Sequence, residues 1–310
     1  MKRFIVTALL TFALLTTPAV TAATVASPSS SLQRKFITSE DGTKIYAEAI
    51  GDSRNPAVVF VHGLGCSVVH FKKQFEDARL RSSVYLIAYD MRGHGRSDGP
   101  LDAEAYESVR YAQDLKAVID NFGVVRPFVA GWSLGALVPS DVVAAYGPSF
   151  ISGVVILGFG LGPDANLMEI VTTPAIRNTM GGFFSTDLVV YRQSSLDFSK
   201  GLYAPNFQVA LEEQQRFVGG MLMMHHEAFA NSANRLPILE PITAARKTLP
   251  FLVIVGAQDA AINSTAVRSY MTGNGFNMEF HELSGVGHSA FYEAPEKTNR
   301  LIGQFVSKYA

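Results

Sequence analysis

Short apolar runs alternate with longer segments of helical periodicity along most of the chain. The runs have the length and composition of buried strands, and they lie at residues 57–61, 84–88, 127–130, 151–157 and 252–255. Residues 105–122 follow a helical pattern, with apolar side chains at Val109, Ala112, Leu115, Ile119 and Phe122. This alternation predicts an α/β fold, in which a mostly parallel sheet is flanked by helices.

The sequence also predicts the elements at the two ends of this alternation of strands and helices. Asp41-Gly42 lies between the strand-like segments 36–38 and 44–49, and an Asp-Gly pair in this context predicts a hairpin turn. Residues 293–309 predict a closing helix. The alternation lapses between Gly158 and Ala245, so we expect this segment to lie outside the main sheet.

A serine lies at one strand-to-helix junction of the pattern. The motif Gly131-Trp132-Ser133-Leu134-Gly135 follows the run at 127–130 and begins a helix-like segment that reaches residue 146. A serine at the apex of such a turn is pushed out of the sheet edge. Glycines flank it because side chains there would collide with the neighbouring strand or helix. The motif therefore predicts a serine nucleophile and acyl transfer to water.

An acid and a histidine follow Ser133 along the chain. Asp259 comes directly after the run at 252–255, at the carboxyl end of a strand, where open α/β sheets place their active sites. His288 lies in the glycine-rich loop at 284–288. We predict that His288 takes the proton of Ser133, and that Asp259 holds the imidazole in the correct tautomer and stabilises the imidazolium.

Two backbone N–H groups are expected to complete this site, because the tetrahedral intermediate of acyl transfer carries a negative charge. Leu134, the residue after the nucleophile, is the first predicted donor. The second is expected from the loop at 62–67, His-Gly-Leu-Gly-Cys-Ser, where Leu64 is the predicted donor. Cys66 is the only cysteine, so no intramolecular disulfide can form. We favour a small buried residue in this loop, behind the two donors, over a reactive thiol.

Taken in order, these motifs resemble those of the α/β-hydrolase superfamily. The matching segments lie within residues 36–308, and they are His62-Gly63, 90–97, 131–135, 256–259 and Gly287-His288. The resemblance implies the α/β-hydrolase fold and a serine esterase with a helical cap inserted between strands 6 and 7. Epoxide hydrolases and haloalkane dehalogenases of this fold carry aspartate where this chain has Ser133.

Three features of the sequence are interpreted separately: a proline in a predicted helix, a turn that contains a histidine and a serine, and a second candidate for the catalytic acid. Pro139 falls inside the predicted helix after the nucleophile, where we expect a local bend. The run at 90–97 is interpreted as a structural turn held by its glycines and Arg92, as in family members, and not as a second site. Asp164 is a rival acid after the sixth strand, and Asp259 is preferred because it ends a strand in a Gly-x-x-Asp context.

The resemblance divides the chain into a core at 32–158 and 246–310 and a cap at 159–245. The cap is rich in Phe and Met, which predicts an apolar substrate pocket beneath it. The candidate pocket residues are Trp132, Met221 and Met224, although a tryptophan beside the nucleophile more often packs in the sheet.

The N-terminal segment predicts export of the protein. Lys2-Arg3, the apolar stretch 4–15 and the small residues 19–23 form a secretory signal peptide at 1–23. This apolar stretch is too short to span a bilayer, which takes roughly twenty residues, and we expect no membrane span. Residues 24–31 predict a disordered leader. In a secreted chain, Asn263 is a candidate glycosylation site within Asn-Ser-Thr.

Charge and histidine placement narrow the possible ligands. The formal net charge is −1, which offers no basic face for a nucleic acid. His225 and His226 are adjacent, so on a helix they would point about 100° apart and could not chelate together. No spaced partners accompany them, and we expect no metal and no cofactor. The expected partner is a small-molecule substrate, and the sequence leaves the oligomeric state open.

The sequence thus predicts a secreted serine hydrolase. Its substrates would be carboxylic esters of apolar, small to medium size, cleaved through an acyl-serine intermediate. One alternative is a perhydrolase, carbon–carbon hydrolase or lyase that uses the same triad. Another is a non-enzymatic ligand-binding protein of the same fold. A binding protein need not keep all three triad residues in these contexts, and this chain keeps them.

Overall fold

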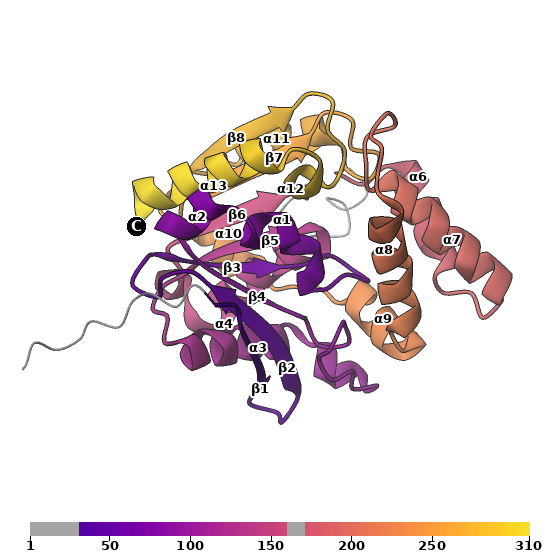
Figure 1. Ribbon diagram of the computed structural model, residues 1–310, viewed down its shortest axis with the longest axis horizontal. Helices are drawn as coiled ribbons and strands as arrows, with labels where there is room; N and C mark the ends of the chain where they lie inside the picture. The colour runs from indigo at the N-terminus through magenta and orange to yellow at the C-terminus, as the bar shows by residue number, and fades with distance from the viewer. Residues whose placement is uncertain (1–30, 160–170) are drawn as a thin grey trace, which may run out of the picture.

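The computed structural model describes residues 31–159 and 171–310 (Figure 1). The signal peptide at 1–23, the leader at 24–31 apart from Ser31, and the rival acid Asp164 lie outside the described residues. Within the described ranges, no helix is long and apolar enough to cross a membrane.

A single sheet of eight strands forms the centre of the described residues, in the order β1-β2-β4-β3-β5-β6-β7-β8. β2 pairs antiparallel with β1 and β4, and the other neighbours are parallel. The strands are β1 (Gln33–Thr38), β2 (Lys44–Ile50), β3 (Ala57–Val61), β4 (Tyr85–Tyr89), β5 (Phe128–Trp132), β6 (Gly153–Leu157), β7 (Phe251–Gly256) and β8 (Met278–Leu283). The mostly parallel sheet and the hairpin at Asp41-Gly42 are therefore confirmed.

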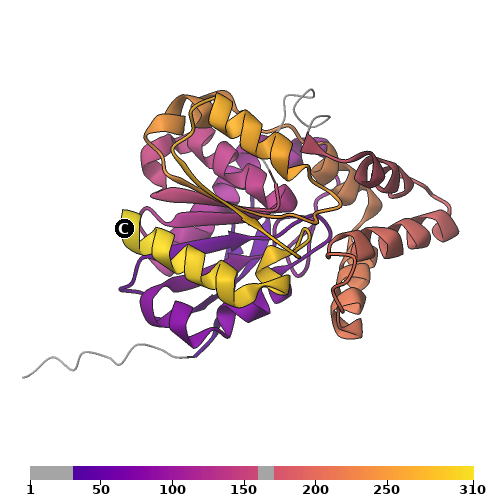
Figure 2. The same cartoon turned by 90° about the horizontal axis from the view of Figure 1, so that it is seen from above.

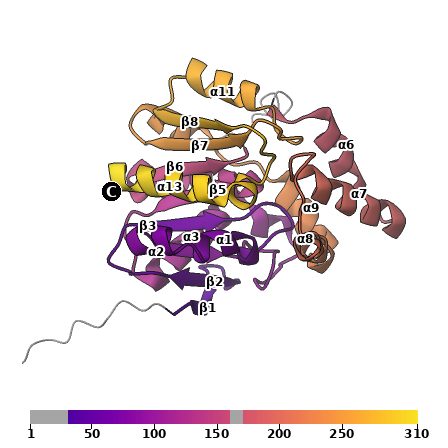
Figure 3. The same ribbon diagram turned by 45° about the horizontal axis from the view of Figure 1, so that its top comes forward.

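Helices cover both faces of this sheet (Figures 2 and 3). One face carries α3 (Ser108–Phe122), α4 (Val138–Tyr146), α10 (Glu240–Ala244) and α11 (Ser264–Gly273). The other carries α1 (Lys72–Phe75), α2 (Ala78–Ser83), α12 (Ala290–Glu293) and α13 (Pro295–Tyr309). Short 3₁₀ helices are η1 (Val68–Phe71), η2 (Ala103–Tyr106), η3 (Ser133–Leu137), η4 (Pro148–Phe150) and η5 (Ala245–Lys247). Strand β3 shows why helices are needed on both faces of the sheet. Val59 points to one face and Phe60 to the other, and both side chains are fully buried.

The chain leaves the sheet between β6 and β7 and forms a helical cap. Its helices are α6 (Pro174–Gly182), α7 (Leu188–Gly201), α8 (Leu211–Met223) and α9 (His226–Asn234), which lie together beyond one end of the sheet (Figure 3). Aromatic contacts join them, since the Phe183 ring packs on Phe198 at 5.4 Å and on Phe229 at 5.3 Å between centroids. Helix α10, which the sequence analysis assigned to the cap, packs against α4 on the core instead.

The turn after β4 is structural, as predicted. Arg92 is fully buried, and its guanidinium makes two hydrogen bonds of 2.7 Å to the carboxylate of Asp114 on α3. A third bond, of 2.8 Å, reaches Asp41 in the β1–β2 hairpin. The guanidinium therefore ties the turn to a helix and to the hairpin, and these contacts account for its conformation without a catalytic role.

Pro139 does not lie in a helix interior, so the predicted bend is wrong. The chain first forms η3 and begins α4 only at Val138, which puts Pro139 in the first turn of that helix. A proline fits there because the N–H group that it lacks has no intrahelical partner. The Gly135 carbonyl still accepts a hydrogen bond, from the N–H of Val138.

Candidate active site

Ser133 directly follows β5 and is the first residue of η3, where the chain turns sharply. Its φ is 51°, in the left-handed region that costs a non-glycine residue about 1–3 kcal/mol. A Cβ on Gly131 would collide with the backbone of Ala136, and one on Gly135 would collide with the carbonyl oxygen of Val61. The flanking glycines are therefore required by close contact with the following helix and the neighbouring strand, as predicted.

His288 and Asp259 are hydrogen-bonded to each other. Nδ1 of His288 lies 2.8 Å from Oδ2 of Asp259, and both side chains are buried. The other oxygen of Asp259 accepts the backbone N–H groups of Ala261 at 2.8 Å and Ile262 at 3.0 Å, which fixes the carboxylate. Because an ionised carboxylate can only accept, Nδ1 carries the proton and Nε2 is left as an acceptor.

Two further contacts hold His288 in place. Nε1 of Trp132 donates a hydrogen bond of 3.1 Å to the carbonyl oxygen of His288. Gly158, directly after β6, has a φ of 63°, and a Cβ there would lie 2.6 Å from the same oxygen and 3.1 Å from Nδ1. Sequence reasoning missed Gly158, although a glycine that directly follows a buried strand is a signal of close backbone approach.

The loop after β3 is held by the buried side chain of His62. Its Nε2 accepts the N–H of Met91 at 2.9 Å, so Nδ1 carries the proton and donates it to the Gly63 carbonyl oxygen at 2.8 Å. Burial lowers the pKa of His62 well below its ordinary value, which keeps the ring neutral. Because C=O and N–H of a trans peptide point in opposite directions, anchoring the Gly63 carbonyl turns the N–H of Leu64 away from His62.

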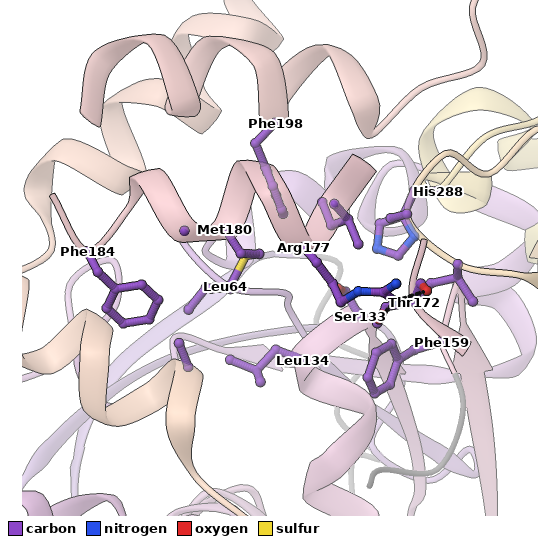
Figure 4. A pocket seen from close by; sticks show the side chains of 15 residues that line it. Leu64, Ser133, Leu134, Phe159, Thr172, Arg177, Met180, Phe184, Phe198 and His288 are labelled. Carbon is purple, nitrogen blue, oxygen red and sulfur yellow. Dashed lines mark hydrogen bonds between the residues drawn. The ribbon is translucent and has the colours of Figure 1, made fainter. Parts of the chain in front are cut away.

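Ser133 and His288 line one cavity of about 660 Å³ (Figure 4). Leu64 and Leu134 lie in the same lining, and the N–H of Leu134 is in the first turn of η3, where such groups have no partner within the helix. The complete lining is Leu64, Ser133, Leu134, Phe159, Thr172, Ile176, Arg177, Met180, Gly181, Phe184, Phe198, Ala233, Ala261, Ile262 and His288. It is mostly apolar.

The three candidate pocket residues do not line this cavity. Trp132 is buried against Phe291, with ring centroids 4.7 Å apart. Met221 packs against Gly65, and Met224 is buried in the cluster between cap and core. The composition of the cap showed that it is apolar, but not which helices line the cavity. These are mainly α6, together with Phe198 of α7 and Ala233 of α9, and not α8.

Sequence reasoning therefore missed the cavity residues of α6. Ile176 and Met180 lie one helical turn apart and both face the cavity. Arg177 also lines it, and its guanidinium donates hydrogen bonds to the carbonyl oxygen and to Oγ1 of Thr172, at 2.5 and 3.1 Å. Figure 4 shows this side chain beside Thr172, so the mostly apolar lining carries a cationic group there.

Three other candidates lie outside this lining. Cys66 is buried, as predicted, and burial raises the pKa of its thiol well above the ordinary value. His225 pairs with Glu227 at 2.6 Å, and nowhere in the described residues do three His, Cys, Asp or Glu side chains group as metal ligands. Asn263 is exposed and caps α11 by accepting the N–H of Ala266, and its glycosylation stays a prediction.

Cap helix α8 packs directly on the loop after β3. A Cβ on Gly220 would collide with the carbonyl oxygen of Gly65. Gly65 itself has a φ of 72°, and a Cβ there would collide with the side chain of Met221. The neighbouring Gly219 has open space around it. The position of α8 and the shape of the loop are therefore fixed together.

The comparisons with known proteins agree with this architecture. The alpha/beta hydrolase family model matches residues 58–301, and the chain belongs to this family. It is 26% identical over 277 residues to the AB hydrolase superfamily protein YisY of Bacillus subtilis (strain 168), a match that covers 87% of this chain and 98% of that protein.

Relatives with more specific names include two kinds of hydrolase. The solved structure of the esterase RhEst1 from Rhodococcus sp. ECU1013 has a TM-score of 0.80 at 26% identity, and covers 89% of this chain and 99% of that one. Human epoxide hydrolase 4 is 21% identical over 291 residues, covering 87% of this chain and 77% of that protein. The protein is therefore a hydrolase of the α/β fold, and the proteins similar to it include an esterase and an epoxide hydrolase.

Substitutions at two adjacent glycines of α8 test its contact with the loop after β3. We expect Gly220→Ala to destabilise the protein by about 1–3 kcal/mol, because the new methyl group overpacks against the Gly65 carbonyl. Gly219→Ala, on the same helix, should stabilise it by roughly 0.5–1 kcal/mol through helix propensity. Urea unfolding measures both values. Equal effects of the two substitutions would contradict the close contact.

Proposed function

We propose that this hydrolase cleaves carboxylic esters, with Ser133 as nucleophile, His288 as general base and Asp259 as the carboxylate that orients it. The observation that carries the proposal is that Ser133 and His288 line one cavity while Nδ1 of His288 is bonded to Asp259 at 2.8 Å. That bond leaves Nε2 available for the serine proton. Similarity to the Rhodococcus esterase supports the ester class.

The reaction follows from these positions in two halves. Oγ of Ser133 attacks the ester carbonyl carbon, and its proton passes to Nε2 of His288. The tetrahedral intermediate collapses, the ester C–O bond breaks, and His288 returns the proton to the departing alcohol, leaving an acyl group on Ser133. Water then attacks the acyl carbon and gives a proton to His288. Collapse of this second intermediate releases the carboxylic acid, and the proton returns to Ser133.

Both intermediates place a negative charge on the former carbonyl oxygen. We assign the backbone N–H groups of Leu64 and Leu134 as its donors, because both residues line the cavity beside Ser133. The His62 ring supports this assignment, since its bond to the Gly63 carbonyl fixes the peptide that carries the Leu64 N–H before any substrate binds. Donors held in advance need no reorganisation during the reaction.

The cavity supports an apolar substrate of small to medium size. Its volume of about 660 Å³ lies within the usual range for small-molecule pockets, and its walls are mostly aliphatic and aromatic. The acyl or the alcohol part of the ester would therefore be transferred from water to an apolar surface between the triad and α6.

Epoxide opening is the competing reaction, because human epoxide hydrolase 4 is among the relatives. Epoxide hydrolases of this fold carry aspartate at the nucleophile position, and a carboxylate that opens an epoxide forms an ester, which water can then cleave. A serine that opened an epoxide would form an ether, which water does not cleave under the same conditions. Ser133 at the nucleophile position therefore favours ester hydrolysis.

We expect Ser133→Ala to abolish ester turnover, leaving only the residual rate that the oxyanion donors and binding supply. His288→Ala should have a similar effect, since the two residues act as one unit. Hydrolysis of a p-nitrophenyl ester measures both. Ser82→Ala, at an exposed position on α2, is the control and should keep wild-type activity. Retention of most activity by Ser133→Ala would refute the assignment.

A series of p-nitrophenyl esters from acetate to palmitate tests the substrate class. Each added methylene contributes about 0.8 kcal/mol when buried, so kcat/KM should rise several-fold per methylene until the cavity is full. We expect a maximum at intermediate chain length. A flat profile, or a strong preference for charged or very long acyl groups, would count against the apolar cavity as the acyl site.

We also propose that the protein acts after export, on the evidence of the N-terminal sequence alone. Cleavage after Ala22 or Ala23 is expected to give a mature chain that starts at Ala23 or Thr24. N-terminal sequencing of the protein from the producing cells measures this. Intact cytoplasmic protein that begins at Met1 would contradict export.

A further inference from the structure

Glu293, at the end of α12, contacts the backbone on both sides of His288. Its carboxylate accepts the N–H of Gly287 at 3.0 and 3.1 Å, through both oxygens. It also accepts the N–H of Ser289 at 3.3 Å. One side chain thus holds the residues immediately before and after the histidine.

The same carboxylate reaches the cap. Its Oε2 accepts the N–H of Ala204 at 2.8 Å, and Ala204 follows the end of α7. The two segments are in close contact there, because a Cβ on Gly287 would collide with the backbone of Tyr203 and Ala204. Glu293 therefore joins the histidine loop to the cap at one point.

These bonds explain why a charged group occupies this partly buried position. No ion pair to Glu293 is present in the described residues, and backbone N–H groups are its partners. Burial, together with the nearby Asp259 carboxylate, raises the pKa of Glu293 above its ordinary value, while the N–H groups of Ala204, Gly287 and Ser289 favour the charged form. A side chain without acceptors would leave these donors unsatisfied.

We propose that Glu293 is a positioning residue, which holds the backbone on both sides of His288 so that the imidazole stays between Asp259 and Ser133. This inference rests on the proposed function of the triad. It goes beyond the triad because Glu293 does not line the cavity, and its hydrogen bonds reach the triad only through the backbone on either side of His288.

Glu293→Gln tests this role with little change in size. Its amide keeps one acceptor oxygen, but the NH₂ group that replaces the other cannot accept the backbone N–H groups bonded there. Misplacement of a catalytic group by about 1 Å can cost roughly a hundredfold, and we expect kcat to fall between tenfold and a hundredfold with KM near the wild-type value. Glu293→Asp keeps the charge and should recover part of kcat. Glu296→Gln, at an exposed position three residues later, is the control and should match wild type.

A second measurement reports on His288 directly and does not depend on ester turnover. We expect the Nδ1 proton of His288, bonded to Asp259, to give a far-downfield proton NMR signal, which His288→Ala should remove. We expect Glu293→Gln to broaden or shift this signal, Glu293→Asp to do so less, and Glu296→Gln to leave it unchanged. If Glu293→Gln does not fold, the comparison of Glu293→Asp with wild type replaces it in both measurements.

The outcomes separate this inference from the proposed function. A folded Glu293→Gln variant with wild-type kcat and an unchanged His288 signal would overturn the inference and leave ester hydrolysis standing. Loss of kcat with an unchanged signal would also overturn it, since the effect would not act through His288. A wild-type protein that cleaves no ester would overturn the proposed function, and the NMR comparison would still test Glu293.

Discussion

The strained turn at Ser133 is the constraint on which the rest of the site depends. A left-handed backbone at a serine persists only where the surrounding packing leaves no alternative. Gly131 packs against η3 and Gly135 packs against the end of β3, so the turn is held between a helix and a strand. The same contact brings the nucleophile next to the loop that follows β3, from which Leu64 reaches the cavity.

Parallel strands bring the other groups to the same place. Asp259 follows β7 and His288 follows β8, so their loops leave the sheet at its carboxyl end together with the turn at Ser133. The cap packs on the loop after β3 through Gly220 and on the histidine loop after β8 through Ala204. The shape of the substrate cavity and the placement of the catalytic groups are therefore parts of one packing arrangement.

The sequence predicted the features that rest on short-range patterns. The strands, the hairpin and the turn at Ser133 are of this kind, because each is marked by a few consecutive residues: an apolar run, an Asp-Gly pair and a serine flanked by glycines. It failed where long-range packing decides, as for Met221, which packs on Gly65 rather than in the cavity. Glu293 was missed for the same reason, since its partners at Ala204 and Gly287 come together only in the folded chain.

The central claim is that ester cleavage passes through an acyl group on Ser133. Mass spectrometry of the enzyme, quenched during turnover of a p-nitrophenyl ester, tests this claim most directly. Acyl transfer through Ser133 predicts a mass increase equal to that of the acyl group, located on the peptide that contains Ser133 and formed together with a burst of p-nitrophenol. Turnover through an adduct on a different residue, or without any burst or adduct, would contradict it.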